Sequence, residues 1–241
     1  MVSTAAHNQD KIIKIIATSD VHGALFPKDY VSGKEYIPSM ATFSSYVKQQ
    51  RNMPDRDIIL LDNGDLLQGD PIVYYYNYID TSTKHIAAII CNYMQYDAFC
   101  MGNHDLEGGP NVYNRFNRQV DFPILSANII NSKTQTNYFT PYTIIRRANK
   151  KVAVIGLTTP KVPTWLPQSL IEDMEFKDML ETAKFWVKHI QQNEKPDVLV
   201  GLFHAGTDTS YNSKQDDDLY MTENASELVA KEVEGFDVVI A

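Results

Sequence analysis

Four short segments of the sequence combine carboxylates, imidazoles and carboxamides with glycine. They read SDVHG, DNGDL, MGNHDLEGG and FHAG, and their candidate ligands are Asp20, His22, Asp65, Asn103, His104, Asp105 and His204. Three of the six histidines of the chain fall in these segments. Oxygen and imidazole donors without thiolates suit Mn, Fe, Zn, Ni or Co, so these side chains could hold divalent metal ions if the fold brought them together.

Each segment taken alone is weak evidence, because Asp-x-His and Asn-Gly-Asp are common and a lone histidine is usually structural. Their shared position is stronger evidence. Each segment closes a run that is typical of a buried strand: KIIKIIATS, DIILLDNGD, YDAFCMGNHD and PDVLVGLFHAG. Ligands of open α/β sheets bind at the carboxyl ends of the strands, and polar groups are costly to bury there unless they pair with one another or with metal.

Helical patterns separate these runs. They cover residues 38–51, 83–94, 112–118, 178–192 and 223–233, and in the second of them Ile86, Ile89, Ile90 and Tyr93 follow one another at helical spacing. Short strands follow one another between residues 122 and 158. The order predicts an α/β fold of parallel sheets covered by helices, with a second sheet packed on the first, in one domain. The YYYNY run at 74–78 could stack a base or sugar, but a partly buried aromatic face is the favoured interpretation.

The composition limits the classes of function. With 241 residues, 44% of them hydrophobic, the chain can bury a full core, and its net charge of −8 argues against nucleic-acid polymers or anionic membranes as main partners. No run is long and apolar enough to span a membrane. Residues 1–10 are expected to be a flexible leader without a signal peptide, and Cys91 and Cys100 are expected to be buried thiols.

The predicted cluster favours phosphoester hydrolysis. Two divalent ions bridged by a carboxylate can clamp an oxyanion and supply a hydroxide that attacks phosphorus in line with the leaving oxygen. A histidine beside them, oriented by an aspartate, can donate a hydrogen bond to the developing charge. His104 and Asp105 fit those two parts.

The order DVH, GD, GNHD, HAG resembles the calcineurin-like metallophosphoesterase superfamily over about residues 12–241. Within it, LLDNGDLLQGDP and GNHDLEGG are most similar to the 5′-nucleotidase group, especially the bacterial 2′,3′-cyclic-nucleotide 2′-phosphodiesterase/3′-nucleotidase branch. The resemblance implies a two-sheet αββα sandwich, two divalent metal ions of unknown identity, with manganese and zinc among the candidates, and a small nucleotide substrate.

The resemblance also implies a role for each ligand. Asp20 and His22 would hold one metal, Asp65 would bridge both, and Asn103 and His204 would hold the other. His104 would donate a hydrogen bond in the transition state with Asp105 orienting it, and Asn103 and His104 would contact the substrate. Asp62 and Asn63 would only support the bridging residue.

The last segment, EVEGFDVVIA, predicts a short buried strand at residues 238–240. In the family such a strand is followed by a Gly-His-x-His stretch that completes both metal sites, and then by a separate nucleoside-binding domain. We therefore expect residues 11–241 to be a C-terminally truncated catalytic domain of a longer, exported protein of the periplasm or cell surface. With five of seven ligands, it is expected to bind metal weakly and to turn over slowly.

The sequence leaves the substrate open among 5′-monophosphates, 3′-monophosphates, 2′,3′-cyclic diesters and UDP-sugars. Two other functions also stay open: a thiosulfohydrolase of the same group, and a non-catalytic binding module on the same fold. A nuclease is disfavoured by the acidic net charge and by the lack of a basic stripe.

Overall fold

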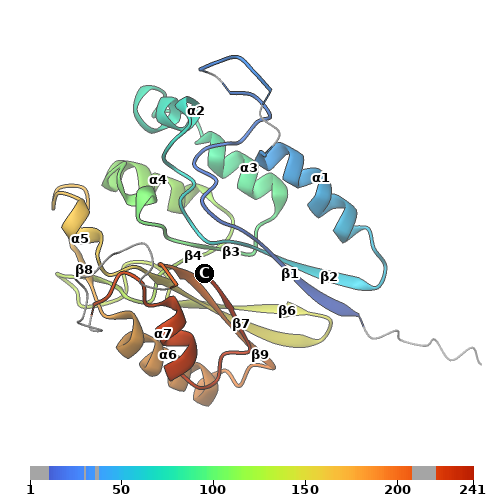
Figure 1. The fold of residues 1–241 in the computed structure, drawn as a ribbon, viewed down its shortest axis with the longest axis vertical. Coiled ribbons are helices and arrows are strands. Elements are labelled where there is room, and N and C mark those ends of the chain that lie inside the picture. The colour runs from blue at the N-terminus through green and yellow to red at the C-terminus, as the bar shows by residue number, and fades with distance from the viewer. Residues whose placement is uncertain (1–10, 30, 36–37, 208–220) are drawn as a thin grey trace, which may run out of the picture.

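The structure, a computed structural model, places two four-stranded sheets face to face between two layers of helices (Figure 1). It describes residues 11–29, 31–35, 38–207 and 221–241, so the leader expected at residues 1–10 lies outside the described part. The predicted two-sheet αββα sandwich is confirmed.

The first sheet is parallel throughout and has the order β1-β2-β3-β4. Its strands are β1 (Ile12–Thr18), β2 (Arg56–Asp62), β3 (Ala98–Cys100) and β4 (Ile124–Leu125). The helices between them are α1 (Met40–Arg51), α2 (Pro71–Tyr74) with a π-helical continuation (Tyr75–Ile79), α3 (Ile86–Met94), a 3-10 turn (His104–Leu106) and α4 (Pro110–Gln119). Helical crossovers of this kind are what parallel pairing of consecutive strands requires.

The second sheet has the order β10-β9-β7-β6 and is parallel except for the antiparallel pair β6–β7. Its strands are β6 (Tyr142–Arg147), β7 (Lys150–Thr158), β9 (Val198–His204) and β10 (Val238–Ile240). A separate antiparallel pair joins β5 (Ile129–Asn131) and β8 (Met174–Phe176). The remaining helices are α5 (Val162–Trp165), α6 (Met179–Asn193) and α7 (Ser226–Glu232).

Three apolar clusters hold the layers together. One lies under α1, α3 and α4 on the first sheet, and a second lies under α6 and α7 on the second sheet. The third joins the inner faces of the two sheets and is formed by Ile59, Leu61, Ala98, Cys100, Leu125, Ile145, Val152, Val154, Val200 and Leu202. Burial on both faces explains why β2, β7 and β9 are continuous apolar runs in the sequence.

Three details go beyond or correct the sequence-based description. The exposed residues of α3 include Ile89 and Tyr93, and its buried face holds Ala87, Ala88, Cys91 and Met94. The tyrosine run at 74–78 is helical, but Tyr74, Tyr75 and Tyr78 are largely exposed. Among the strands that the structure describes, β10 pairs only with β9, at a sheet edge, and its first residue, Val238, is exposed.

Other expectations hold. Cys91 and Cys100 are buried free thiols. Within the described ranges, no helix combines the length and apolar character that crossing a bilayer would need.

Candidate metal centre

The strands that precede the four polar segments end at one edge of the sandwich. Thr18 of β1 pairs with Asp62 of β2, and Thr158 of β7 pairs with His204 of β9. The side chains that follow these strands line one cleft of about 650 Å³, and the sequence-predicted residues in its lining are Asp20, His22, Asp65, Asn103, His104 and His204. Six of the seven predicted site residues therefore share one cavity.

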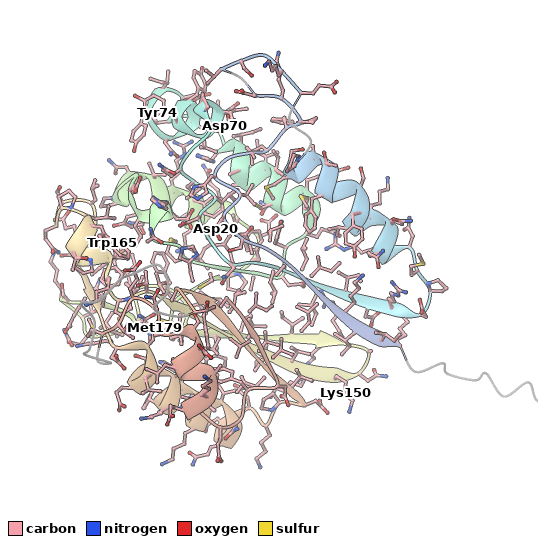
Figure 2. All side chains as sticks on the ribbon, in the orientation of Figure 1. Asp20, Asp70, Tyr74, Lys150, Trp165 and Met179 are labelled. Atoms are coloured by element: carbon pink, nitrogen blue, oxygen red, sulfur yellow. The ribbon has the colours of Figure 1, made fainter. Side chains whose placement is uncertain are left out.

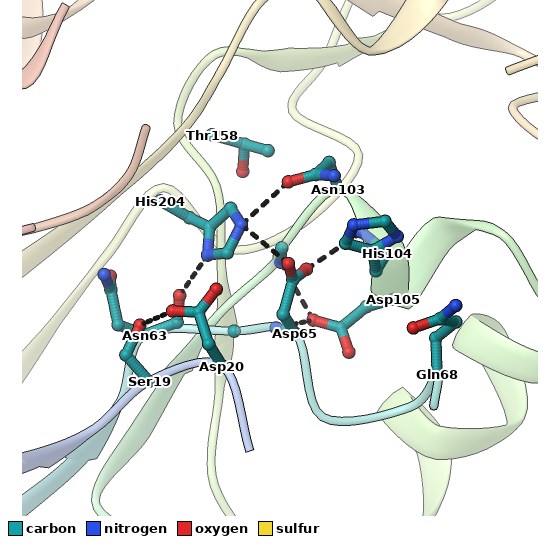
Figure 3. Close-up of polar contacts among 12 residues, drawn as sticks. Ser19, Asp20, Asn63, Asp65, Gln68, Asn103, His104, Asp105, Thr158 and His204 are labelled. Carbon is teal, nitrogen blue, oxygen red and sulfur yellow. Dashed lines mark hydrogen bonds and ion pairs between the residues drawn. The ribbon is translucent and has the colours of Figure 1, made fainter. Parts of the chain in front are cut away.

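Three of these side chains converge on a single point. One potential ligand atom from each of Asp20, Asp65 and His204 lies within 4.8 Å of the other two. Nε2 of His204 lies 3.2 Å from Oδ2 of Asp65 and 2.8 Å from Oδ1 of Asn103 (Figure 3). The other oxygen of Asp65 accepts a hydrogen bond from the main-chain N–H of His104 at 2.8 Å.

His22 contacts Gln68 and lies beside the ring of His104. Its Nδ1 lies 3.2 Å from both the main-chain and the side-chain oxygen of Gln68, so Nδ1–H can donate to either one. Its ring centroid lies 5.3 Å from that of His104. A histidine held through one nitrogen in this way keeps the other nitrogen for a metal.

The main chain is strained at three of the predicted ligands. Asp20, His22 and Asp65 have φ values of 54°, 49° and 61°, in the left-handed region that only a few per cent of residues other than glycine adopt, although aspartate and histidine do so more often than most. Hydrogen bonds from Asp20 N to Gly64 O (3.0 Å) and from His22 N to Asp65 O (2.8 Å) hold this arrangement. Strained residues persist where the surrounding structure fixes them, and they cluster at functional sites.

Asp65 and His204 shift the pKa of one another. Burial alone would raise the pKa of Asp65, but the hydrogen bond from His204 and its positive charge hold it below the ordinary value. Burial likewise opposes the charged form of His204, yet the hydrogen bond to Asp65 and its negative charge raise the pKa of His204 to about 9. At neutral pH without metal, the two side chains therefore form a buried ion pair.

In this ion pair, a proton on Nε2 of His204 occupies the position where a metal ion could bind. The Nε2 proton of His204 is shared between carboxylate and carboxamide oxygens, and a cation at that position would meet the same three donor atoms. In addition, Oδ1 of Asn63 is buried beside the cleft and has no protein hydrogen-bond partner in the described ranges. Such orphaned acceptors usually face water or an ion. The donor set thus fits hard or borderline divalent metals.

Asp62 lies beneath this cluster. Its carboxylate accepts hydrogen bonds from the Thr18 hydroxyl at 2.5 Å and from Gly64 N at 2.9 Å. Burial raises the pKa of Asp62 to about 7. Asp62 therefore joins the end of β1 to the turn that carries Asp65.

The partner of His104 differs from the expected one. Nδ1 of His104 lies 2.6 Å from a carboxylate oxygen of Glu107, three residues farther along the chain, and not near that of Asp105. The 3-10 turn at His104–Leu106 explains this, because residues three apart share a face of such a helix. Glu107 is not among the residues predicted from the sequence, because its spacing from His104 in HDLE indicates a contact only where the chain forms a 3-10 turn.

Asp105 has a different task. Its carboxylate is fully buried, and its oxygens accept hydrogen bonds at 2.8–2.9 Å from four main-chain N–H groups, those of Asp65, Leu66, Leu67 and Gly102. Burial and the negative charge of Asp65 raise the pKa of Asp105, and the main-chain donors oppose that rise by stabilising the carboxylate. These bonds tie the loop after β2 to the loop after β3. Within the described residues the ring of His104 is hydrogen-bonded to Glu107, and the orienting role of Asp105 stays a prediction.

Comparisons with known proteins find a matching family and related sequences. The calcineurin-like phosphoesterase family model matches residues 13–241. The chain is 28% identical to the trifunctional nucleotide phosphoesterase protein YfkN of Bacillus subtilis, over 95% of this chain and 16% of that protein. It is 30% identical to the 2′,3′-cyclic-nucleotide 2′-phosphodiesterase/3′-nucleotidase of Haemophilus influenzae, over 84% of this chain and 32% of that one.

The fold has solved counterparts. The crystal structure of the calcineurin-like phosphoesterase YfkN from Bacillus subtilis superimposes with a TM-score of 0.80 and 28% sequence identity, and the match covers 93% of this chain and 70% of that one. The chain thus spans a third or less of the length of the two curated relatives described above. The family match extends over nearly all of the chain, and the chain belongs to the calcineurin-like phosphoesterase family.

Proposed function

We propose that this chain is the catalytic domain of a phosphoester hydrolase that depends on two divalent metal ions and acts on nucleotides. The observation that carries the proposal is the convergence of Asp20, Asp65 and His204 within 4.8 Å, beside His104, in a cleft large enough for a nucleotide. The relatives named as nucleotide phosphoesterases support the substrate class.

The acidic lining of the cleft supports a need for metal. Asp20, Asp65 and Glu107 all face it, and carboxylates alone would repel a phosphate. We assign Asp20 and His22 to one ion, Asn103 and His204 to the other, and Asp65 to both. When bound, two such ions polarise the phosphoryl oxygens and make water a stronger nucleophile.

The residues of the chain supply the rest of the mechanism. Glu107 holds Nδ1–H of His104, so that a protonated ring presents Nε2–H to the cleft. From there His104 can donate a hydrogen bond to the phosphoryl group and pass the proton to the leaving oxygen. Asn103, beside His204 in the same cleft, is placed to contact the substrate as well.

The assignment of residues 11–241 as one catalytic domain belongs to the same proposal, as does an exported location at the periplasm or cell surface. The relatives are much longer than this chain, which supports the presence of a further domain in proteins of this group. Fractionation of cells that express the native protein tests the location.

The test is phosphate release from AMP, 3′-AMP and 2′,3′-cyclic AMP (the last with phosphatase added), with Mn²⁺ or with a chelator. We expect metal-dependent release that Asp65→Asn abolishes. Asp57→Asn is the matched control because Asp57 lies near the start of β2, at the opposite end of the strand that leads to Asp65. Release of sulfate from a thiosulfate ester in place of phosphate would favour the thiosulfohydrolase alternative, and metal binding without any turnover would favour a binding module.

A further inference from the structure

A buried polar network lies beside the metal centre, where the ends of β3, β4 and β7 meet. Its side chains are those of Ser126, Asn128 and Thr158, and all three residues are fully buried. Side chains fill the space between the two sheets (Figure 2), and an apolar cluster joins the inner faces of the sheets. Polar groups are costly to bury in such surroundings, and where their hydrogen bonds are satisfied they make the structure around them rigid.

The hydrogen bonds of this network fix the direction in which the Thr158 hydroxyl points. It donates to the carbonyl of Met101 at 2.7 Å. Because a threonine hydroxyl has a single proton to donate, it accepts from the Ser126 hydroxyl, which lies 2.9 Å away. Asn128 holds the main chain of Thr158, since Thr158 N donates to Oδ1 of Asn128 at 2.9 Å and Nδ2 of Asn128 donates to the Thr158 carbonyl at 2.7 Å. The hydroxyl is therefore held in place and directed at the loop after β3.

Thr158 connects the two segments that carry Asn103 and His204. Met101, whose carbonyl accepts the hydrogen bond, lies two residues before Asn103 in the chain. Thr158 also pairs with His204 between β7 and β9, and Thr159 N donates to the carbonyl of His204 at 2.8 Å. Oδ1 of Asn103 lies 2.8 Å from Nε2 of His204, and Figure 3 shows Thr158 next to these two side chains. A single hydroxyl thus bonds the segment of one predicted ligand to the strand that neighbours the other.

We propose that Thr158 is a positioning residue that holds Asn103 at the distance from His204 at which both bind the same metal ion. This inference rests on the proposed function, which assigns these two side chains to one ion. Thr158 is fully buried and is not among the residues that line the cleft, so it acts through Asn103 and not on the substrate.

The residues assigned to the other ion are held by different contacts. Asp20 N and His22 N donate to main-chain carbonyls of the loop after β2, and Nδ1 of His22 lies 3.2 Å from two oxygens of Gln68. None of these bonds includes a member of the Thr158 network. Loss of the Thr158 hydroxyl should therefore weaken the binding of one ion more than that of the other.

A titration with Mn²⁺ tests this asymmetry. Thr158→Val keeps the shape of the side chain and removes its hydroxyl, whereas the control Ser126→Ala removes a neighbouring buried hydroxyl and leaves the bond from Thr158 to Met101. We expect Thr158→Val to bind one ion as the wild type does and the other at least about tenfold more weakly, as for other groups that orient metal ligands. Thr158→Ser should restore most of the affinity, and Ser126→Ala should keep both ions. The proposal is wrong if Thr158→Val binds both ions as the wild type does, or if Ser126→Ala loses as much affinity.

Crystal structures of the metal-free variants separate this inference from the proposed function. We expect the distance of 2.8 Å between Asn103 and His204 to lengthen beyond hydrogen-bonding range in Thr158→Val and to persist in Ser126→Ala and Thr158→Ser. If the wild type binds no Mn²⁺, the proposed function fails, and these distances alone decide whether Thr158 positions Asn103. An unchanged distance in Thr158→Val overturns the inference. If Thr158→Val does not fold, Thr158→Cys, whose thiol is a weaker donor, replaces it with the same expected results.

Discussion

The contact between His104 and Glu107 is the residue-scale feature that most directly concerns catalysis. The two side chains meet at 2.6 Å at the edge of the cleft, away from the converging ligand atoms. A carboxylate in this position fixes the orientation of the ring. It follows that Glu107 acts through His104 and not through the metal.

Changing Glu107→Gln should therefore lower kcat for nucleotide hydrolysis roughly tenfold to a hundredfold, the range found for groups that orient a functional histidine. Metal content and KM should stay near wild type, because Glu107 is not among the converging ligands. Steady-state kinetics with metal analysis checks both parts, and Glu181→Gln on α6 is the control. Loss of metal from Glu107→Gln would show that Glu107 is a ligand and that this assignment is wrong.

The environment of Asp105 leads to a different expectation. Replacing Asp105 with Asn would turn an amide N–H₂ group toward main-chain N–H donors, leaving at least one of them without an acceptor. We expect Asp105→Asn to lower the free energy of unfolding by about 1–3 kcal/mol, as for other buried unsatisfied donors. Urea denaturation of the metal-free protein measures this. Unchanged stability with a selective fall in kcat would instead support the catalytic role first expected for Asp105.

At the scale of elements, close packing between loops positions the bridging carboxylate. A Cβ atom on Gly102, in the loop after β3, would lie 2.2 Å from Oδ1 and 2.4 Å from N of Asp65. The second of these is a main-chain atom that cannot move aside without shifting the whole loop. The absence of a side chain at 102 is thus a requirement of the site.

The variant Gly102→Ala should displace Asp65 and weaken metal binding by at least about tenfold, as judged from losses caused by disturbed ligand orientation. Gly33→Ala is the matched control, since it has a left-handed φ of 72° but open space around the added methyl. It should cost about 1 kcal/mol of stability and leave metal affinity unchanged. Equal metal affinity in both variants, measured by calorimetric titration, would contradict the account of this loop.

The start of α3 should make the fold sensitive to acid. Nδ1 of His85 accepts a hydrogen bond from the main-chain N–H of Ala87 at 3.1 Å, and Nε2 lies 2.9 Å from Oδ1 of Asn77. Burial, helped by the charge of Arg115, lowers the pKa of His85 to about 4. The unfolded chain, with a pKa near 6.5, then binds the proton more tightly than the folded chain does.

This contribution to stability is present above pH 6.5 and is lost as the pH falls toward 4. It amounts to about 3 kcal/mol when complete. Unfolding free energies at several pH values should decline less steeply in His85→Gln than in the wild type, with His189→Gln on α6 as a control that keeps the wild-type slope. Parallel curves for wild type and His85→Gln would contradict the assignment of a buried neutral histidine.

The sequence predicted the elements that follow from local patterns of apolar residues. It did not predict features that depend on how side chains pack in the folded chain. The strands before Asp20, Asp65, Asn103 and His204 were recognisable as apolar runs, and so was the gathering of ligands at their ends. The buried face of α3 was not, because its alanines and Cys91 pack inward while Ile89 and Tyr93 remain exposed. Similarly, the choice of Glu107 over Asp105 as the partner of His104 depends on a 3-10 turn that spacing alone does not fix.

At the scale of the whole molecule, the metal centre joins the two sheets. Nδ1 of His204, at the end of β9, lies 2.6 Å from the carbonyl oxygen of Asn63, which follows β2, and Nδ2 of Asn63 donates to the carbonyl of Phe203 at 3.0 Å. The predicted ligands that follow strands of the first sheet thus meet His204 of the second sheet at the interface between the two sheets. A bound metal would link the two halves of the sandwich.

Binding of Mn²⁺ should therefore stabilise the folded chain as a unit. At a free metal concentration a hundred times Kd, the gain is about 2.7 kcal/mol per site and appears as a higher Tm in scanning calorimetry. Asp65→Asn should abolish the rise in Tm, and Asp57→Asn should keep it. A rise that persists in Asp65→Asn would mean that the ions bind elsewhere.

The central claim is that the ligands at the ends of these strands hold a two-metal centre bridged by Asp65. The most direct measurement is an anomalous difference map from crystals soaked in Mn²⁺. We expect two peaks about 3.5–4 Å apart, with Asp65 between them, Asp20 and His22 at one, and Asn103 and His204 at the other. A map with no peak within coordination distance of Asp65 would contradict it.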